Sequence, residues 1–239
     1  MPESWIRSPA GQWLLSNERK MVNQLLPELH GYYQLQYSGL GVKLLQQTSL
    51  DHDFYVSQAQ DADHSLACID YCHLPFRENT MDAVVLHHVL DFTQNPHQCL
   101  RDAARVVVPN GYLVVVGFNP WSICGVRRRF AREHRGPWRG YHITMSRLKD
   151  WMALLGFRDE KHGYGQFFFP LHIRGFHGVV NTLDSGLSRM GLPIGGVYVL
   201  IARKLVAGMT PIRPKWRPLP ARGLSIATPT TRGVRVTHR

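Results

Sequence analysis

Apolar residues along the chain follow two patterns, helical spacings and short uninterrupted runs. Over residues 8–26 the helical spacing gives one apolar side and ends before a proline, which predicts a leading helix. Residues 81–86 and 112–117 are apolar runs typical of strands buried on both faces of a parallel sheet. Between these runs, Asn95 and Pro96 form a helix start, and apolar residues follow at i, i+3, i+4 and i+7.

Weaker patterns complete the sheet. An aromatic, alternating stretch predicts a first strand, which leads into the turn at Gly39 and Gly41 and then into a helix starting near residue 42. Parallel strands need crossover helices, so the alternation predicts an α/β fold of the doubly wound type. We expect a mostly parallel seven-stranded sheet with helices on both faces and an antiparallel edge strand. The expected strands are 32–37, 53–57, 65–69, 81–86, 112–117, a region over 157–169, and 197–201, and a further helix covers 148–155.

One domain is expected over residues 1–205, with insertions at 119–140 and 164–193. Residues 206–239 lack aliphatic periodicity and are rich in Pro, Gly, Thr and Arg, which predicts a disordered basic tail. The start of the chain lacks a signal-peptide pattern, and no apolar stretch is long enough to cross a bilayer. The sequence therefore predicts a cytoplasmic protein with no membrane span.

The formal net charge of +11 comes almost entirely from two segments, and the rest of the chain is close to neutral. One segment is the basic tail, and the other is residues 127–139. Such segments either bind nucleic acid or form solvated charged faces. Nucleic acid is therefore one possible partner. The arginines of the second segment are Arg127, Arg128, Arg129, Arg132, Arg135 and Arg139.

Cysteines and histidines are the candidate metal ligands. The cysteines lack the paired C-x-x-C spacing of zinc sites, so we expect reduced, mostly buried thiols. His87 and His88 are adjacent, and neighbouring residues on a strand point to opposite faces rather than toward one ion. The sequence therefore predicts no metal site. The four cysteines are Cys68, Cys72, Cys99 and Cys124.

In a doubly wound sheet, ligands bind beyond the carboxyl ends of the strands, where helix N-termini and free backbone N–H groups are available. Gly39 and Gly41 stand at such a position. A glycine pair alone fits either a ligand cradle or an ordinary tight turn. Its interpretation depends on the rest of the chain.

Three segments together resemble the type 11 group of class I, Rossmann-like S-adenosylmethionine-dependent methyltransferases. They are Asp-Tyr-Cys-His-Leu-Pro-Phe at 70–76, Met-Asp-Ala-Val-Val at 81–85 and Arg-Val-Val-Val-Pro-Asn-Gly at 105–111. The family pattern has an acidic residue before Leu-Pro-Phe, a Phe-Asp-x-Val strand, and a helix that ends in Arg-Val-Leu-x-Pro-Gly-Gly. The first motif is degenerate, because Leu35 and Tyr37 stand where the family has an acidic residue and a glycine.

The resemblance implies S-adenosylmethionine as the cofactor and gives roles to several residues. Asp70 would accept a hydrogen bond from the adenine amine, and the Tyr71 N–H would meet a ring nitrogen. Gly39 and Gly41 would let the backbone approach the amino-acid half of the cofactor. Ser57 stands near the place of the family's ribose-binding acid, where it would form a weaker, neutral hydrogen bond.

The acceptor side is implied to lie after the fourth and fifth strands. His87 and His88 would face the transferred methyl group, where either could act as a general base or orient the acceptor, and the alternative is that they pack in the core. Asn119 is either an acceptor contact or a turn residue. Arginines beside aromatic residues suit a small-molecule or lipid-like acceptor.

The sequence thus predicts an S-adenosylmethionine-dependent methyltransferase with an unidentified acceptor. Two alternatives stay open. The chain could have this fold without catalysis and serve as a binding or scaffold module, or it could associate with nucleic acid through its basic tail.

Overall fold

The computed structural model describes residues 5–26, 31–46, 50–57, 66–67, 72–122, 125, 140, 142–167 and 193–205. The chain divides into two units, Met1–Val206 and Ala207–Arg239, and every described residue lies in the first. No helix within these ranges is long and apolar enough to cross a membrane. The expected basic tail and the arginine-rich segment 127–139 lie outside the described residues.

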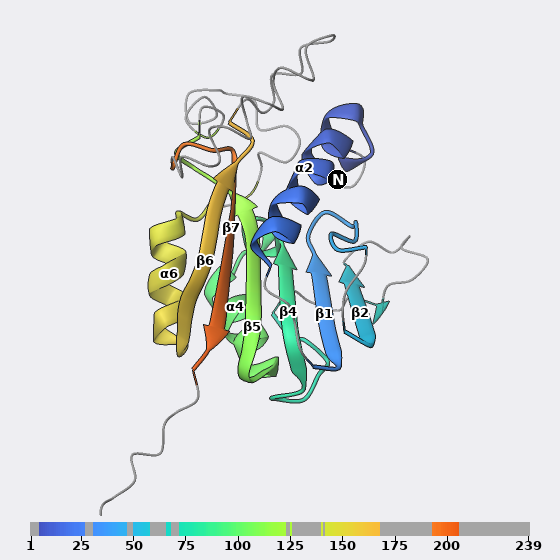
Figure 1. Ribbon diagram of the computed structural model, residues 1–239, viewed down its shortest axis with the longest axis vertical. Coiled ribbons are helices and arrows are strands. Elements are labelled where there is room, and N and C mark those ends of the chain that lie inside the picture. Colours follow the sequence, from blue (N-terminus) through green and yellow to red (C-terminus); the bar gives the residue numbers. More distant parts are fainter. Residues whose placement is uncertain are drawn as a thin grey trace, which may run out of the picture. The chain divides into compact units, whose positions relative to one another are not determined.

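Seven strands form one sheet in the order β3-β2-β1-β4-β5-β7-β6 (Figure 1). The neighbours from β3 to β5 are parallel, and β7 is antiparallel to both β5 and β6. The predicted seven-stranded, mostly parallel sheet is confirmed, and its antiparallel strand lies one position in from the edge strand β6. The strands are β1 Tyr33–Ser38, β2 His52–Ser57, β3 Leu66–Ala67, β4 Met81–His87, β5 Val107–Phe118, β6 Phe157–Gly165 and β7 Val197–Lys204.

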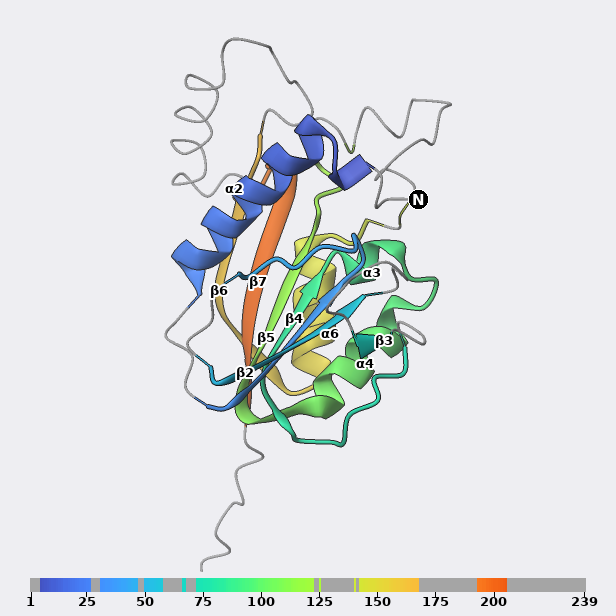
Figure 2. The same cartoon turned by 90° about the vertical axis from the view of Figure 1, so that its right-hand side faces the viewer.

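Helices cover both faces of the sheet, as Figure 2 shows. Helix α2 (Pro9–Leu25) lies on one face, and α3 (Val89–Phe92), α4 (Pro96–Val106) and α6 (Met145–Leu154) lie on the other. Successive strand residues point to opposite faces, so β4 supplies Val85 to the α2 side and its neighbours Val84 and Leu86 to the α4 side. The apolar run of β4 is therefore explained by burial on both faces.

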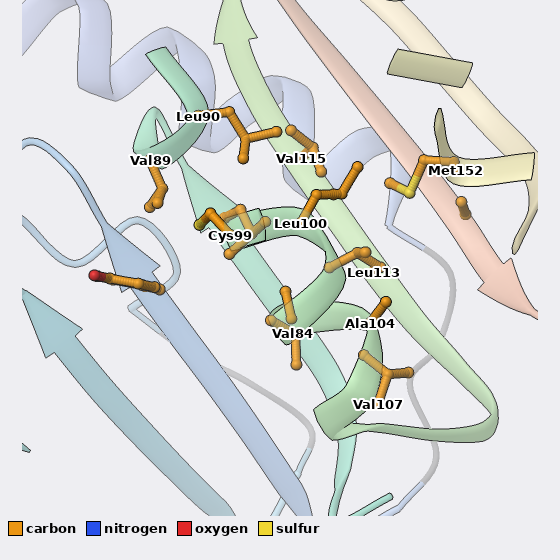
Figure 3. Packing of buried hydrophobic residues seen from close by; sticks show 14 of the residues in the cluster. Val84, Val89, Leu90, Cys99, Leu100, Ala104, Val107, Leu113, Val115 and Met152 are labelled. Atoms are coloured by element: carbon orange, nitrogen blue, oxygen red, sulfur yellow. The ribbon is translucent and has the colours of Figure 1, made fainter. Parts of the chain in front are cut away.

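The core on the α4 side is built around that helix (Figure 3). Its Leu100 and Ala104 are buried in one cluster with Val84 of β4 and Leu113 of β5. Each large aliphatic side chain buried in this way contributes about 1.5–3 kcal/mol of transfer free energy. Cys72 and Cys99 are buried in the same cluster and are not joined in a disulfide, as expected for these two thiols.

The leading helix is confirmed within a residue of its predicted bounds. Ser8 caps α2, because its Oγ accepts a hydrogen bond from Gly11 N at 3.2 Å, and Pro9 takes the first helical position. Leu14, Leu15 and Val22 bury the apolar side of the helix against the sheet. The helix thus follows from local sequence alone.

The prediction of a helix directly after the glycine turn is wrong for the described residues 42–46, which form bends and irregular backbone. Their backbone groups bond to side chains instead of to one another. The Arg19 guanidinium donates to Lys43 O and Leu44 O, and the Gln36 amide accepts from Leu45 N and donates to Leu45 O. Leu44 and Leu45 pack with α2 in one cluster, so the leading helix covers this part of the sheet.

Strand β5 begins at Val107, directly after α4, and not after the expected turn at residues 109–111. The turn residues lie within the strand, where the register between β4 and β5 shifts between Met81 and Ala83. Asn110 has φ +65° there. The turn signal therefore marks an irregularity in the strand rather than the strand's start.

Asp82 ties the start of β1 to β4, because its Oδ2 accepts hydrogen bonds from Tyr32 N at 2.8 Å and Tyr33 N at 2.9 Å. We expect Asp82→Ala to lower the free energy of unfolding in urea by about 1–3 kcal/mol, since two donors lose a charged acceptor. Asp51→Ala, at an exposed carboxylate, is the matched control. Equal midpoints for the two variants would contradict this role of Asp82.

Candidate functional site

The sheet reverses its strand order between β1 and β4, because the chain continues from β1 to β2 on one side and returns to β4 on the other. Ligands of doubly wound sheets bind at the carboxyl ends of the strands at such a point. In this sheet the strand ends are aligned: Ser38 of β1 pairs with Ser57 of β2 and with His87 of β4. The candidate site lies at this edge.

The glycine turn joins β1 to β4 at the switch point. Gly39 N donates to His87 O at 2.8 Å, and a Cβ on Gly39 would lie 2.7 Å from His88 O. Gly39 is therefore required by the close approach of the protein's own backbone. Gly41 has φ +72°, a conformation that favours glycine.

Five polar side chains from α2, β1, β4 and the start of α3 meet beside this turn, and we call them the Glu18 cluster. Glu18 of α2 accepts from His87 Nε2 at 3.0 Å through one oxygen and from His88 Nε2 at 2.8 Å through the other. His87 Nδ1 lies 3.0 Å from Ser38 Oγ, and His88 Nδ1 lies 2.8 Å from Asp91 Oδ2. All five side chains are at most 1% exposed.

The expectation that His87 and His88 point to opposite faces is wrong. His88 follows the last residue of β4 and takes a left-handed conformation, with φ 55° and ψ 16°. This conformation is uncommon for a residue with a side chain, and it ends the strand's alternation. Both Nε2 atoms consequently reach the same carboxylate.

Burial and neighbouring charges have opposite effects on the pKa values of Glu18, His87 and His88. Burial by itself would raise the pKa of Glu18, but the charge of His88 and hydrogen bonds from both histidines hold that pKa at about 2. Burial also opposes the charging of His88, yet Glu18 and Asp91 raise the pKa of His88 to about 9. Burial lowers the pKa of His87 despite its hydrogen bond to Glu18. At neutral pH the cluster thus holds a carboxylate between a cationic and a neutral imidazole.

All four imidazole nitrogens of the two histidines have a partner within the cluster. A cationic His88 cannot accept a proton. In this geometry the two histidines fasten α2 to the end of β4. A general-base role for His87 or His88 stays a prediction.

Asn119 follows β5 and is 2% exposed. Its amide donates to Pro193 O at 2.8 Å and Gly195 O at 2.9 Å, and its Oδ1 accepts from Trp121 N at 3.1 Å. Asn119 therefore shapes the turn after β5 and holds the segment before β7. Its hydrogen bonds are those expected of a turn residue. Its contact with an acceptor stays a prediction.

The remaining cofactor candidates are Ser57, Asp70 and Tyr71. Ser57 ends β2 and is 2% exposed. Asp70 and Tyr71 lie outside the described residues, between the end of β3 and Cys72. In β1, Leu35 is buried in the core, and the neighbouring Gln36 carries the polar group that fixes the following loop.

Three residues at this edge were missed from the sequence: Glu18, Asp91 and Tyr198. The sequence contained a signal for Glu18: this acid lies four residues after Leu14 and four before Val22, on the apolar side of the leading helix. Asp91 Oδ1 and the Tyr198 hydroxyl are buried, and neither has a hydrogen-bond partner within the described ranges. Burial, together with the charge of Asp91, raises the pKa of Tyr198 well above its ordinary value, so its phenol stays protonated.

Removing the Glu18 carboxylate should destabilise the fold strongly. Glu18→Ala leaves two buried histidines without their shared acceptor, and we expect a loss of about 3–5 kcal/mol in the free energy of unfolding, measured in urea. Ser16→Ala, at an exposed position of the same helix, is the control and should change stability by less than about 0.5 kcal/mol. Similar losses in both variants would show that the Glu18 cluster does not hold α2.

Residues 31–115 match the family model described as the methyltransferase domain. This segment runs from β1 into β5 and contains the glycine turn, the two histidines and Asp91. It therefore includes both sides of the switch point, whereas Glu18 comes from the helix that precedes it.

Known proteins resemble the chain in sequence and fold. An uncharacterized Escherichia coli protein, YafS, is 28% identical over 213 residues, which is 87% of this chain and 83% of YafS. A Thermotoga maritima S-adenosylmethionine-dependent methyltransferase, described as a possible histamine N-methyltransferase, superimposes with a TM-score of 0.61 at 17% identity, over 82% of this chain and 91% of that one. The [4+2]-cyclase SpnF superimposes with a TM-score of 0.51 at 18% identity, over 84% of each chain. These structural similarities show a shared fold.

Proposed function

We propose that the chain transfers the methyl group of S-adenosylmethionine to a small-molecule acceptor, because its residues 31–115 match the family model of the methyltransferase domain. One observation carries the proposal: the turn at Gly39 and Gly41 lies at the switch point between β1 and β4, inside the matched segment. This is the place where doubly wound sheets bind their ligands.

The described residues fit the cofactor in part. At Gly39 the space of a Cβ is taken by His88 O, so the backbone at Gly41 is left to approach the amino-acid half of the cofactor. Asp70 and Tyr71, which follow β3, would hold the adenine through a carboxylate and a backbone N–H. Ser57 is a neutral residue at the end of β2, and it would hold the ribose less strongly than an acid.

When bound, the cofactor would supply an electrophilic methyl group for a lone pair of the acceptor, with S-adenosylhomocysteine as the leaving group. This chain's residues would orient the acceptor, because transfer to a good nucleophile depends largely on positioning. Asp91 Oδ1 and the Tyr198 hydroxyl support this role, since both are buried polar atoms without a described partner. Asp91 follows β4, and β7 begins at the same edge of the sheet, next to the end of β5. The pair would suit an acceptor that carries both hydrogen-bond donors and acceptors.

Calorimetric titration with S-adenosylmethionine and S-adenosylhomocysteine tests the cofactor. We expect both to bind, and we expect Asp70→Ala to raise Kd about tenfold, because the adenine amine loses its acceptor. Asp51→Ala, at an exposed acid outside the proposed site, should leave Kd unchanged. No heat with folded protein at millimolar ligand would refute the proposed function.

Incubation with tritium-labelled S-adenosylmethionine and a whole-cell extract tests the acceptor class. Label should appear in the fraction of low molecular mass after precipitation of macromolecules. If the label is instead recovered in nucleic acid or protein, the small-molecule proposal is wrong.

Tyr198→Phe separates an acceptor-binding role of the hydroxyl from a structural one. Removal of an unpartnered buried hydroxyl should leave the free energy of unfolding unchanged or raise it by about 1 kcal/mol. If the hydroxyl holds the acceptor, methyl transfer in the extract assay should nevertheless fall about tenfold. Unchanged transfer by a variant of equal stability would rule out this role.

A further inference from the structure

The Glu18 cluster has the donor set and spacing of a metal site. One carboxylate and two imidazole Nε2 atoms converge, with N–O distances of 2.8 and 3.0 Å, and the three ligand atoms all lie within 4.8 Å of one another. Around a tetrahedral zinc ion with bonds of about 2.0–2.1 Å, ligand atoms lie about 3.3 Å apart. To seat an ion between them, the widest of these separations, at most 4.8 Å, would have to close by up to about 1.5 Å.

The backbone at His88 is arranged so that this convergence occurs. Its left-handed conformation, with φ 55°, is unfavourable for a residue other than glycine, and such conformations gather at functional sites. A non-strained continuation of β4 would direct His88 away from Glu18. The strain is thus used to bring two adjacent histidines onto one carboxylate.

Each histidine also has the outer partner that metal-binding histidines need. His88 Nδ1 lies 2.8 Å from Asp91 Oδ2, a carboxylate–histidine arrangement that fixes ring orientation and raises the basicity of the nitrogen that binds the ion. His87 Nδ1 lies 3.0 Å from Ser38 Oγ. Asp91 is itself held, because its Oδ2 accepts from Phe118 N at 3.0 Å.

Charge and burial favour a divalent cation at this place. Glu18 and Asp91 bring two carboxylates into an interior where each is at most 1% exposed. Charges buried in this way need pairing or metal coordination. Coordination requires both Nε2 atoms to be free of hydrogen: His88 would release one proton to solvent, and His87 would carry its proton on Nδ1, where Ser38 Oγ accepts it.

We propose that Glu18, His87 and His88 bind one divalent transition-metal ion, with Zn²⁺ as the first candidate. Imidazole and carboxylate ligands suit zinc. The ion would join the leading helix α2 to the carboxyl end of β4. The three ligands are separate from Asp70, Tyr71 and Gly41, and the two sites meet only at Asp91, whose Oδ2 contacts His88 and whose Oδ1 is proposed to orient the acceptor.

The test uses the full chain, purified without an affinity tag. Elemental analysis should find about one metal ion per chain after dialysis, and Co²⁺ loaded in its place should give the visible absorption of a four-coordinate site. With free Zn²⁺ at 100 times Kd, the Tm should rise by about 5–10 °C over the chelator-treated protein. A folded protein that binds neither ion and has the same Tm with and without chelator overturns the proposal.

Variants locate the ion. Glu18→Gln keeps the size of the side chain and its capacity for hydrogen bonds but removes the anionic ligand. We expect Glu18→Gln and His88→Gln, each as a single variant, to abolish the Co²⁺ absorption. His73→Gln, at an exposed histidine, is the matched control and should retain the absorption. Metal content that is equal in all three variants places the ion elsewhere and refutes the site. If a variant fails to fold, the spectrum and chelator response of the unaltered chain decide the matter.

Discussion

The paired hydrogen bonds of the Glu18 carboxylate hold together the edge of the sheet at which the candidate site lies. This carboxylate is fully buried, and each of its oxygens accepts from a different histidine at the end of β4. An unpaired carboxylate in that position would cost several kcal/mol, so the helix that carries it and the strand end that receives it must form together. The leading helix is thereby tied to the functional edge of the sheet.

The same helix also replaces an element that a doubly wound fold would normally supply. Where a helix is expected after the glycine turn, Arg19 of α2 bonds to the backbone carbonyls of Lys43 and Leu44, and Leu44 packs beneath the helix. Because these carbonyls bond to a side chain, the segment need not form helical hydrogen bonds of its own. The adjacent residues Glu18 and Arg19 thus fix the two sides of the switch point: Glu18 holds the end of β4, and Arg19 holds the segment that follows β1.

The fold by itself leaves the reaction open, since a methyltransferase and a [4+2]-cyclase both superimpose on this chain. The assignment of methyl transfer therefore depends on the matched segment and on the site at the switch point. Gly39 is retained although the first motif is degenerate at Leu35 and Tyr37, because His88 O occupies the space that its Cβ would take.

The sequence by itself determined the strands, the leading helix and helix α4, because apolar periodicity and capping residues act locally: Ser8 and Pro9 begin α2, and Leu100 and Ala104 lie on the buried side of α4. It also located the edge of the sheet at which doubly wound folds bind their ligands, since Gly39 and His87 follow strands that the pattern predicts. Only the tertiary structure decided what the residues at that edge do. His87 and His88 meet one carboxylate because His88 has positive φ and Glu18 arrives from a helix about 70 residues earlier, and neither fact is encoded in local spacing. Contacts of such sequence separation depend on how the whole chain packs, which is why the site, unlike the strands, could not be read from the pattern.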